Sequence, residues 1–239
     1  MIKPLLITSL CAFLAAAGFF SLAAASGVAH GNGDFWRNLE HWDFDSGDGP
    51  RIEGGGPVTT RTLAWPGGET LEIAIGADVE YTQGSAASIV ATGPKGAVDN
   101  LVVRDGELRF DRPMRHNGGL KVVMTAPDVK AFSLLGSHSL TIRGYQQDRL
   151  EIALAGSGDV DVHGETQSFK AAIAGSGDID AADLKVADAK VNIAGSGDAT
   201  VGPTNSAEIS IAGSGDVELT SHPADLKSNV MGSGSVTTR

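Results

Sequence analysis

Cysteine is almost absent from this chain of 239 residues. The single cysteine, Cys11, lies inside an apolar run near the amino terminus, so no disulfide can hold the rest of the chain together. Aromatic residues are also scarce, at 5% of the sequence. The core must therefore be filled by Val, Ile, Leu and Ala, which suits narrow coils.

Basic residues are outnumbered by acidic ones. The chain has 18 Lys and Arg against 29 Asp and Glu, which gives a formal net charge of −11. A protein that binds nucleic acid or anionic lipid needs positive charge to neutralise phosphates. The charge balance therefore argues against both as partners, whereas it suits solubility and is compatible with cation binding.

Long apolar runs are missing after the first 25 residues. Residues 1–25 combine Lys3, an apolar run that starts at Leu5 and the small-residue ending Ala23-Ala24-Ala25, a pattern typical of a cleaved secretory signal peptide. An uncleaved membrane anchor is the alternative, because about 20 apolar residues can span a bilayer. We expect cleavage near Ala25, no membrane span in the mature chain and a location outside the cytoplasm.

Glycine, by contrast, is abundant, with 32 residues, and much of it belongs to one repeated phrase. Ala-Gly-Ser-Gly-Asp occurs four times, at residues 155–159, 174–178, 194–198 and 212–216. A degenerate copy starts at Gly136 and a worn copy at Gly232, and successive leading glycines are 18 to 20 residues apart. A period this steady indicates stacked repeats.

Apolar residues recur at every second position on both sides of the phrase. Around Gly195 they are Ala189, Val191 and Ile193 before it, and Ala199 and Val201 after it. A spacing of two is the period of a β-strand. Each repeat is therefore predicted as a strand, a tight Gly-Ser-Gly-Asp corner, a second strand and a variable return.

A repeat of this length cannot bury its apolar face alone. Stacking the repeats in parallel, ~4.8 Å apart, would bury a continuous core and pair every strand with its neighbours. The sequence thus predicts an all-β fold, a right-handed parallel β-helix (β-solenoid) with coils of about 19 residues. The corners would need glycine for positive φ or close approach. The predicted structural corner residues are Gly156, Gly158, Gly175, Gly177, Gly195, Gly197, Gly213 and Gly215.

The predicted solenoid extends over residues 58–239 and has two parts. Residues 130–239 carry the phrase and should form regular coils. Residues 58–129 lack it but alternate short apolar runs with turn signals such as Asp105-Gly106, so we expect irregular coils of the same solenoid there. A small separate β-domain is the alternative for this segment.

Residues 26–57 show no period and are rich in Gly, Asp and aromatic residues. We interpret them as a flexible leader. In the alternative, Trp36, Leu39 and Trp42 form a short amphipathic turn that docks on the end of the solenoid or binds a partner.

The repeated phrase, together with the signal peptide and the strand Leu71–Ile75, resembles the auto-transporter adhesin, head-GIN-domain family over about residues 60–239. The resemblance implies a β-helical fold in a bacterial protein of the periplasm, the secreted fraction or the cell surface. It also implies an adhesive or binding role, and it carries no catalytic residues over to this chain.

An acidic ladder is the first candidate site. The aspartates that end the four phrases, Asp159, Asp178, Asp198 and Asp216, should stack on one edge. Each is expected to accept hydrogen bonds from the N–H groups of its own corner. The alternative is a row of weak Ca²⁺ sites, which need several oxygen ligands each. The structural role is the preferred reading, so no metal or other cofactor is predicted.

Histidines offer no zinc site, because none of the six are at i and i+4 and no cysteine joins them. Ser137-His138-Ser139 invites a catalytic reading, but neighbours in a strand point to opposite faces. A carbohydrate-active β-helix enzyme, similar to a polysaccharide lyase or hydrolase, is an alternative by fold analogy alone.

The sequence therefore predicts a non-enzymatic β-solenoid outside the cytoplasm that acts as a binding, adhesion-type or structural surface module. Its partner is not specified by the residues; a glycan or the cell-envelope surface fits the resemblance. The alternatives are the β-helix enzyme and a periplasmic accessory of an envelope sensing system.

Overall fold

The computed structural model describes residues 52–53, 55–116 and 118–239. All of them belong to the second of two compact units, residues 49–239. The predicted signal peptide and residues 26–51 of the predicted leader lie outside the described residues. No helix in the described part is long and apolar enough to cross a membrane.

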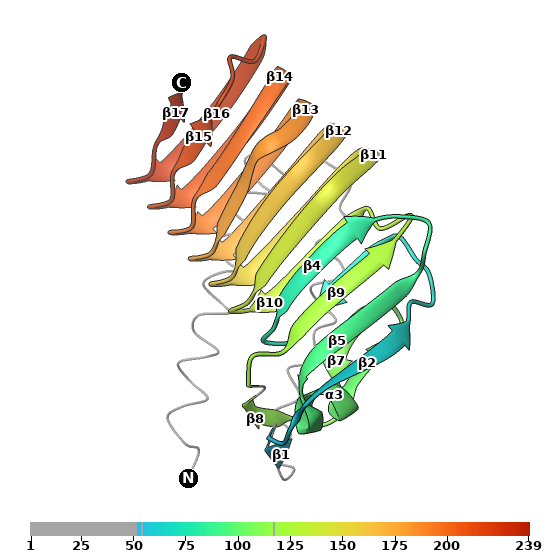
Figure 1. Cartoon of the computed structure of the whole chain (residues 1–239). Coiled ribbons are helices and arrows are strands. Elements are labelled where there is room, and N and C mark those ends of the chain that lie inside the picture. The colour runs from blue at the N-terminus through green and yellow to red at the C-terminus, as the bar shows by residue number, and fades with distance from the viewer. Residues whose placement is uncertain (1–51, 54, 117) are drawn as a thin grey trace, which may run out of the picture. The chain divides into compact units, whose positions relative to one another are not determined.

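The carboxyl-terminal part of the described chain is a stack of parallel coils, a β-solenoid, as the repeat predicts (Figure 1). The leading glycines of the phrases pair with one another in a single register column from Gly136 to Gly232. The sequence repeat is thus the coil repeat. The coils are made of β10 (Ala131–Gly136), β11 (Ser139–Gly156), β12 (Asp159–Gly175), β13 (Asp178–Gly195), β14 (Ala199–Gly213), β15 (Val217–Leu219), β16 (Asp225–Gly232) and β17 (Val236–Thr238).

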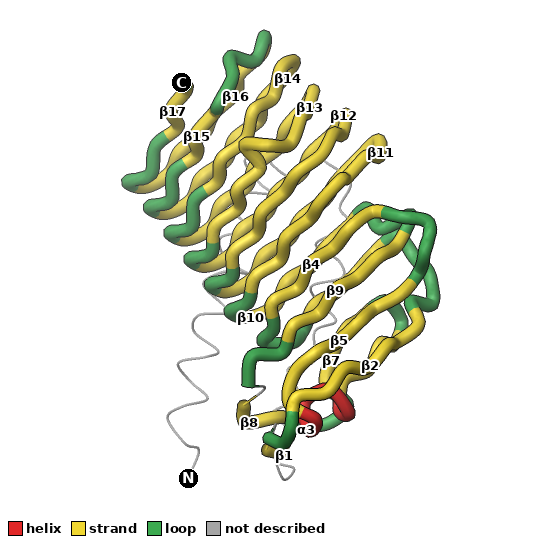
Figure 2. The backbone as a smooth tube through the Cα atoms, viewed as in Figure 1, coloured by secondary structure: helices red, strands yellow, loops and turns green. Residues whose placement is uncertain are grey.

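Each coil has a first side, which leads into the corner, and a second side, which leaves it. The predicted variable return between the second side and the next first side is itself strand (Figure 2). Its residues pair between coils, as Glu165 does with Lys185, and its inward side chains Tyr145 and Leu184 are buried. Register shifts after Ile142 bend the strand there, so the period of two is interrupted and the sequence pattern alone misses the pairing.

The core lies along the inward columns of the stack. Ile193 is 2% exposed and lies opposite Ile173 and Ile211 of the adjacent coils. Ala194, the next residue, faces outward and is partly exposed. The predicted strand phase is therefore confirmed at this position.

Residues 58–129 form a head at the amino-terminal end of the stack, and here the prediction of irregular coils needs correction. One coil continues the stack in parallel: β3 (Thr70–Ile73) pairs with β10, and β4 (Asp78–Gln83) pairs with β11. β7 (Glu107–Phe110) and β9 (Lys121–Ala126) extend the two sides in parallel.

Beyond these strands the pairing becomes antiparallel. β6 (Leu101–Arg104) pairs with β7, β5 (Ser88–Pro94) with β9, and β2 (Val58–Ala64) with β5. Asp105 and Gly106, which join β6 to β7, both have positive φ, at 52° and 85°; such a two-residue turn folds a chain back into a hairpin. The short helix α3 (Lys95–Asn100) was not predicted, and β1 (Ile52–Glu53) pairs with β8 (Met114–His116) in a separate ribbon.

The head and the stack share one core. Tyr81 of the head packs edge-on against Phe132 of β10 with ring centroids 4.9 Å apart, and its hydroxyl donates to the Ala126 carbonyl at 2.8 Å. On the surface, the Glu69 carboxylate bridges Lys130 at 3.0 Å and Arg149 at 2.9 Å. These contacts attach the irregular head to the regular coils.

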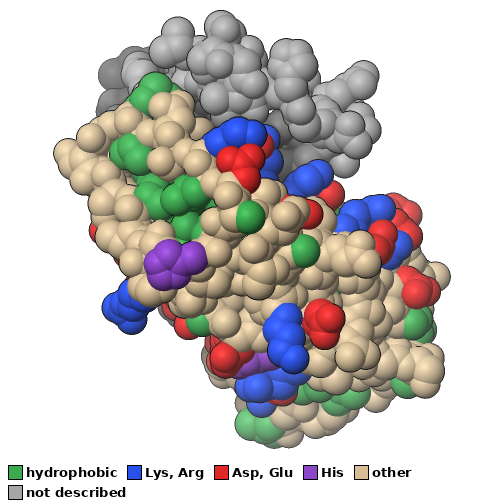
Figure 3. All heavy atoms as spheres, turned by 90° about the horizontal axis from the view of Figure 1, so that it is seen from above, with side chains coloured by type: hydrophobic (Ala, Val, Ile, Leu, Met, Phe, Trp, Pro, Cys, Tyr) green, Lys and Arg blue, Asp and Glu red, His purple; other side chains and the backbone are tan. Residues whose placement is uncertain are grey.

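The carboxyl-terminal end of the stack is different. β16 pairs with β14 and β17 with β15, and no other strand of the described chain pairs with either. Apolar side chains reach the surface at this end, where the space-filling view shows hydrophobic atoms grouped together (Figure 3). The last coil therefore exposes positions that earlier coils bury.

Candidate functional site

The glycine corners are stacking contacts. A Cβ placed on Gly195 would lie 2.0 Å from the carbonyl oxygen of Gly175 in the preceding coil, and Gly195 has a φ of +138°. A Cβ on Gly197 would lie 2.1 Å from the carbonyl oxygen of Gly177. No side chain fits at either distance, so both positions of the phrase require glycine. The remaining predicted corner glycines, Gly156, Gly158, Gly175, Gly177, Gly213 and Gly215, meet the preceding corner in the same way, at 2.0–2.3 Å.

The acidic ladder forms, but its hydrogen bonds differ from those predicted. The Asp198 N–H donates to Asp178 Oδ1 at 2.9 Å, and the Asp216 N–H donates to Asp198 Oδ1 at 2.7 Å. Ser235 continues the row by donating its N–H and hydroxyl to Asp216 Oδ1. The carboxylates of Asp178, Asp198 and Asp216 thus accept from the next coil rather than from their own corner, because parallel stacking brings the equivalent N–H of that coil within reach.

Asp159 is the exception in this ladder. The Asp178 N–H above it donates to the Gly158 carbonyl at 3.1 Å instead. Three carboxylates of the ladder therefore accept a backbone N–H of the next coil, and the Asp159 carboxylate does not. Within the described residues, no three His, Cys, Asp or Glu side chains come together as a group that could hold a metal ion.

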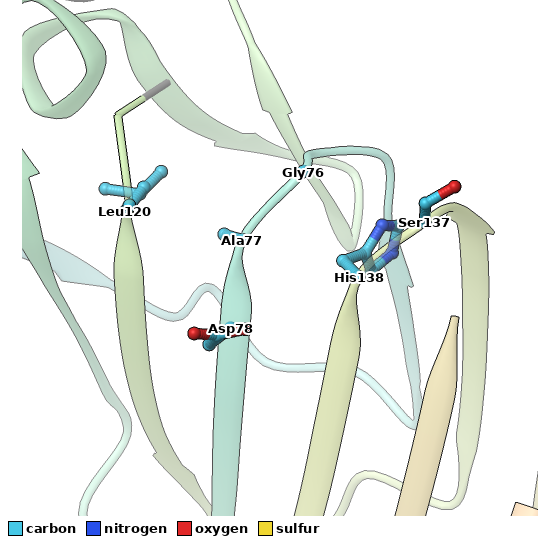
Figure 4. A pocket seen from close by; sticks show the side chains of 7 residues that line it. Gly76, Ala77, Asp78, Leu120, Ser137 and His138 are labelled. Carbon is cyan, nitrogen blue, oxygen red and sulfur yellow. The ribbon is translucent and has the colours of Figure 1, made fainter. Parts of the chain in front are cut away.

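A pocket of about 130 Å³ lies where the regular corners meet the head (Figure 4). The pocket lies here because the column of stacked corner glycines stops at Gly136. A Cβ on Gly136 would meet only the His138 ring, at 3.6 Å, and no backbone of the preceding coil. His138 occupies the fourth position of the phrase, where the later corners have their second glycine. The pocket is lined by Gly76, Ala77, Asp78, Gly119, Leu120, Ser137 and His138.

His138 is the buried polar residue of this pocket. Its side chain is 7% exposed, and neither ring nitrogen makes a well-formed hydrogen bond to the described residues. Burial lowers the pKa of His138, and the nearby backbone of Ile73 opposes this only in part. The ring is therefore neutral near pH 7, with one donor and one acceptor nitrogen.

The residues beside His138 do not assemble a nucleophile and a base. The Ser137 side chain points away from the ring (Figure 4). The Ser139 hydroxyl donates to Asp78 Oδ1 at 2.7 Å. This placement agrees with the expectation from strand geometry that the Ser-His-Ser sequence does not form a dyad.

The two long sides of the coils carry different charge. The second side is acidic, and its outward carboxylates are Asp159, Asp161, Asp178, Asp180, Asp198, Asp216 and Glu218. His163 lies between two carboxylates, 3.0 Å from Asp161 and 3.3 Å from Asp183.

On the first side, the charges pair between coils. Lys170 contacts Glu151 at 3.3 Å, and Lys190 contacts Glu208 at 2.8 Å. The outward positions between them are small or amide residues, including Ala172, Asn192 and Ser210. This side is a regular, charge-balanced surface.

Sequence reasoning found the corners and the ladder but missed the pocket. Its lining comes from three segments, near residues 76, 119 and 137, and their proximity depends on the topology of the head. The available signal was His138 itself, a bulky residue at the fourth position of the phrase, where the other copies have glycine.

Comparison with known proteins points to one family. The family described as "Putative auto-transporter adhesin, head GIN domain" matches residues 69–223. No curated protein matches the chain.

Solved structures share the fold. A "putative adhesin" from Bacteroides fragilis aligns with a TM-score of 0.67 at 21% identity, covering 79% of this chain and all of that one. A "putative lipid binding protein" from Parabacteroides distasonis aligns with a TM-score of 0.53 at 25% identity, covering 80% of this chain and all of that one. A "putative adhesin" from Parabacteroides merdae aligns with a TM-score of 0.51 at 18% identity, covering 79% and 99%.

Proposed function

Because the chain belongs to the family described as "Putative auto-transporter adhesin, head GIN domain", we propose that it is a non-enzymatic binding module of the adhesion type. The predicted signal peptide, at residues 1–25, supports a place of action outside the cytoplasm. The proposal assigns binding to the surface of the coils and no catalytic role to any residue.

The observation that carries this proposal is the contrast between the two long sides. The second side concentrates acidic residues, and the chain as a whole carries a net charge of −11. An anionic cell envelope would repel that side. The first side pairs its charges, at Lys170–Glu151 and Lys190–Glu208, so it can approach such a surface without that penalty.

The first side also fits an extended partner. Its outward residues repeat from coil to coil at the spacing of neighbouring strands, ~4.8 Å. A polymer of similar units, such as an envelope glycan, can contact several coils at once, and weak contacts then add up along the stack. The pocket at His138, at about 130 Å³, is too small for such a polymer.

The enzyme alternative has less support. The outward carboxylates recur from coil to coil, whereas a catalytic site is local. Three of the four phrase aspartates already accept backbone N–H groups, so they serve the stack itself. The third alternative, an accessory of an envelope sensing system, shares the binding role and differs in its partner.

The test is a glycan-array and envelope-binding assay on the secreted chain, with one blocking variant for each side. Ala174→Arg places a long side chain on the exposed first side, and Asp180→Arg does so on the exposed second side. We expect Ala174→Arg to weaken binding by at least about tenfold, a change of about 1.4 kcal/mol, and Asp180→Arg to have little effect. Absence of binding to any glycan or envelope fraction, or equal loss in both variants, would refute the proposal.

A further inference from the structure

The last coil of the described chain exposes positions that inner coils of the stack bury. Leu226 is 44% exposed and Val230 is 38% exposed, although Phe169 and Ile173, in the same columns of an inner coil, are buried. Three of the five exposed large hydrophobic residues in the described chain lie on β16: Leu226, Val230 and Met231, the others being Val58 and Val123. β16 pairs with β14 on one edge only, and its other edge has no partner strand in the described chain, so this edge is a template for another strand.

We propose that a second copy of this chain covers this end, by pairing its own β16 with β16 in antiparallel orientation about a two-fold axis at Ser228. This inference concerns self-association and goes beyond the proposed binding function. In this register the whole of residues 225–231 pairs. Leu226 of each copy lies opposite Val230 of the other, and Ser228 lies opposite Ser228.

The sequence of β16 is self-complementary in this register. Leu-Lys-Ser-Asn-Val, from Leu226 to Val230, has the same order of apolar, polar and small residues in both directions. The inward residues have even numbers, so a two-fold axis through Ser228 keeps inward residues opposite inward residues. The facing serine hydroxyls can hydrogen-bond to each other.

Charge also favours this register at this edge. Asp225 and Lys227 of the same strand are 3.2 Å apart, so the edge is locally neutral although the chain is strongly acidic. An axis at Ser228 places Lys227 opposite Asn229 and Asp225 opposite Met231. An axis at Lys227 would place two lysines opposite each other, and an axis at Leu226 would leave Val230 opposite His222, outside the strand.

The decisive experiment uses cysteine cross-linking in the full chain with Cys11→Ser, which removes the single native cysteine. Directly opposite residues of an antiparallel pair have Cα atoms about 4.5–5.5 Å apart, within the range of a disulfide. Under mild oxidation, Ser228→Cys should therefore form a covalent dimer in high yield. Asn229→Cys, on the same strand, is the control, because its counterpart lies two residues away along the partner strand and should cross-link poorly.

Sedimentation analysis of the native chain, with no cysteine introduced, measures its association independently of cross-linking. We expect a monomer–dimer equilibrium that strengthens with added salt, because salt screens the repulsion between two acidic chains. Val230→Asp should weaken the dimer by at least about tenfold. Val123→Asp, at an equally exposed valine of the head (37%), should not weaken it. Circular dichroism checks that each variant keeps its strand content.

Three results would overturn the proposal. The first is a monomer at every concentration tested, which would mean that the edge is free or is covered by residues 26–51 of the same chain. The second is equal cross-linking at positions 228 and 229. The third is a dimer that Val230→Asp leaves unchanged, which would place the interface elsewhere.

Discussion

The regular coils and the head build their corners in different ways. In the stack, Gly195 and Gly197 lie so close to the preceding corner that a Cβ would meet a carbonyl oxygen at 2.0–2.1 Å. In the head, the corner between β3 and β4 runs through Ala74–Ala77, and its backbone stays more than 4 Å from the Cβ position of Gly136. The gap admits the His138 ring and leaves the pocket. The residues of a corner are therefore dictated by the coil beneath it.

The largest predicted effect breaks a stacked corner. Gly195→Ala should lower the free energy of unfolding by more than about 4 kcal/mol, because the new Cβ collides with the Gly175 carbonyl and the backbone must also hold a positive φ. Gly68→Ala, in the head, is the control: its φ is also positive, at +126°, but nothing lies within 4 Å. It should cost about 1–2 kcal/mol. Chemical denaturation measures both, and equal losses would show that the corners are not tightly stacked.

The second prediction concerns the shared core of the stack. Ile193→Ala should cost about 2–5 kcal/mol, because it opens a cavity between Ile173 and Ile211. Ala194→Ser, one residue further along and facing outward, should cost under about 0.5 kcal/mol. The two thermal melts together test the strand phase, and a reversed order would contradict it.

The third prediction separates two members of the acidic ladder. Asp178→Ala removes the acceptor of the Asp198 N–H and should cost about 0.5–1.5 kcal/mol. Asp159→Ala should cost less, because the N–H of the next coil is bonded to the Gly158 carbonyl instead. Urea denaturation of the two variants gives the comparison. A larger loss for Asp159→Ala would mean that the hydrogen-bond assignment is wrong.

A smaller effect should appear on acidification, at the boundary between head and stack. Burial holds the pKa of His138 below its usual value of 6.5, so the unfolded chain takes up this proton more readily than the folded chain. Stability should therefore fall as the pH drops below about 6.5, until the folded-state pKa is reached. Besides His138, the titratable side chain that lines this pocket is Asp78.

The control for this pH effect is His138→Gln, which cannot titrate there. The free energy of unfolding, measured between pH 7.5 and 5, should decline less steeply in this variant than in the native chain. The other histidines are the same in both proteins, so the difference reports His138. Identical pH profiles would show that His138 contributes nothing to the acid sensitivity.

The sequence pattern predicts the coils of the stack but not the antiparallel strand pairing of the head, for a physical reason. In the stack, one coil repeats, so the phrase that contains Gly195 and the columns that contain Ile193 carry the same information several times. In the head each contact occurs once: the antiparallel hairpin depends on the positive φ of Asp105 and Gly106. The pocket at His138 likewise depends on three segments that are separate in the sequence, near residues 76, 119 and 137. The ladder was placed correctly, but its donors were assigned to the wrong coil because the exact stacking geometry decides them.

The central claim is that the repeated corner residues build the stack and do not bind a ligand. It is tested most directly by the effect of Ca²⁺ on thermal stability, measured against Na⁺ at matched ionic strength, for the native chain and for Asp178→Asn. The asparagine keeps an acceptor oxygen for the Asp198 N–H. We predict no Ca²⁺-specific rise in melting temperature and nearly equal stability of the two proteins. A Ca²⁺-specific rise, which would grow as RT ln(1 + [L]/Kd) and be lost in Asp178→Asn, would contradict the account and make Asp159, Asp178, Asp198 and Asp216 a cation-binding ladder.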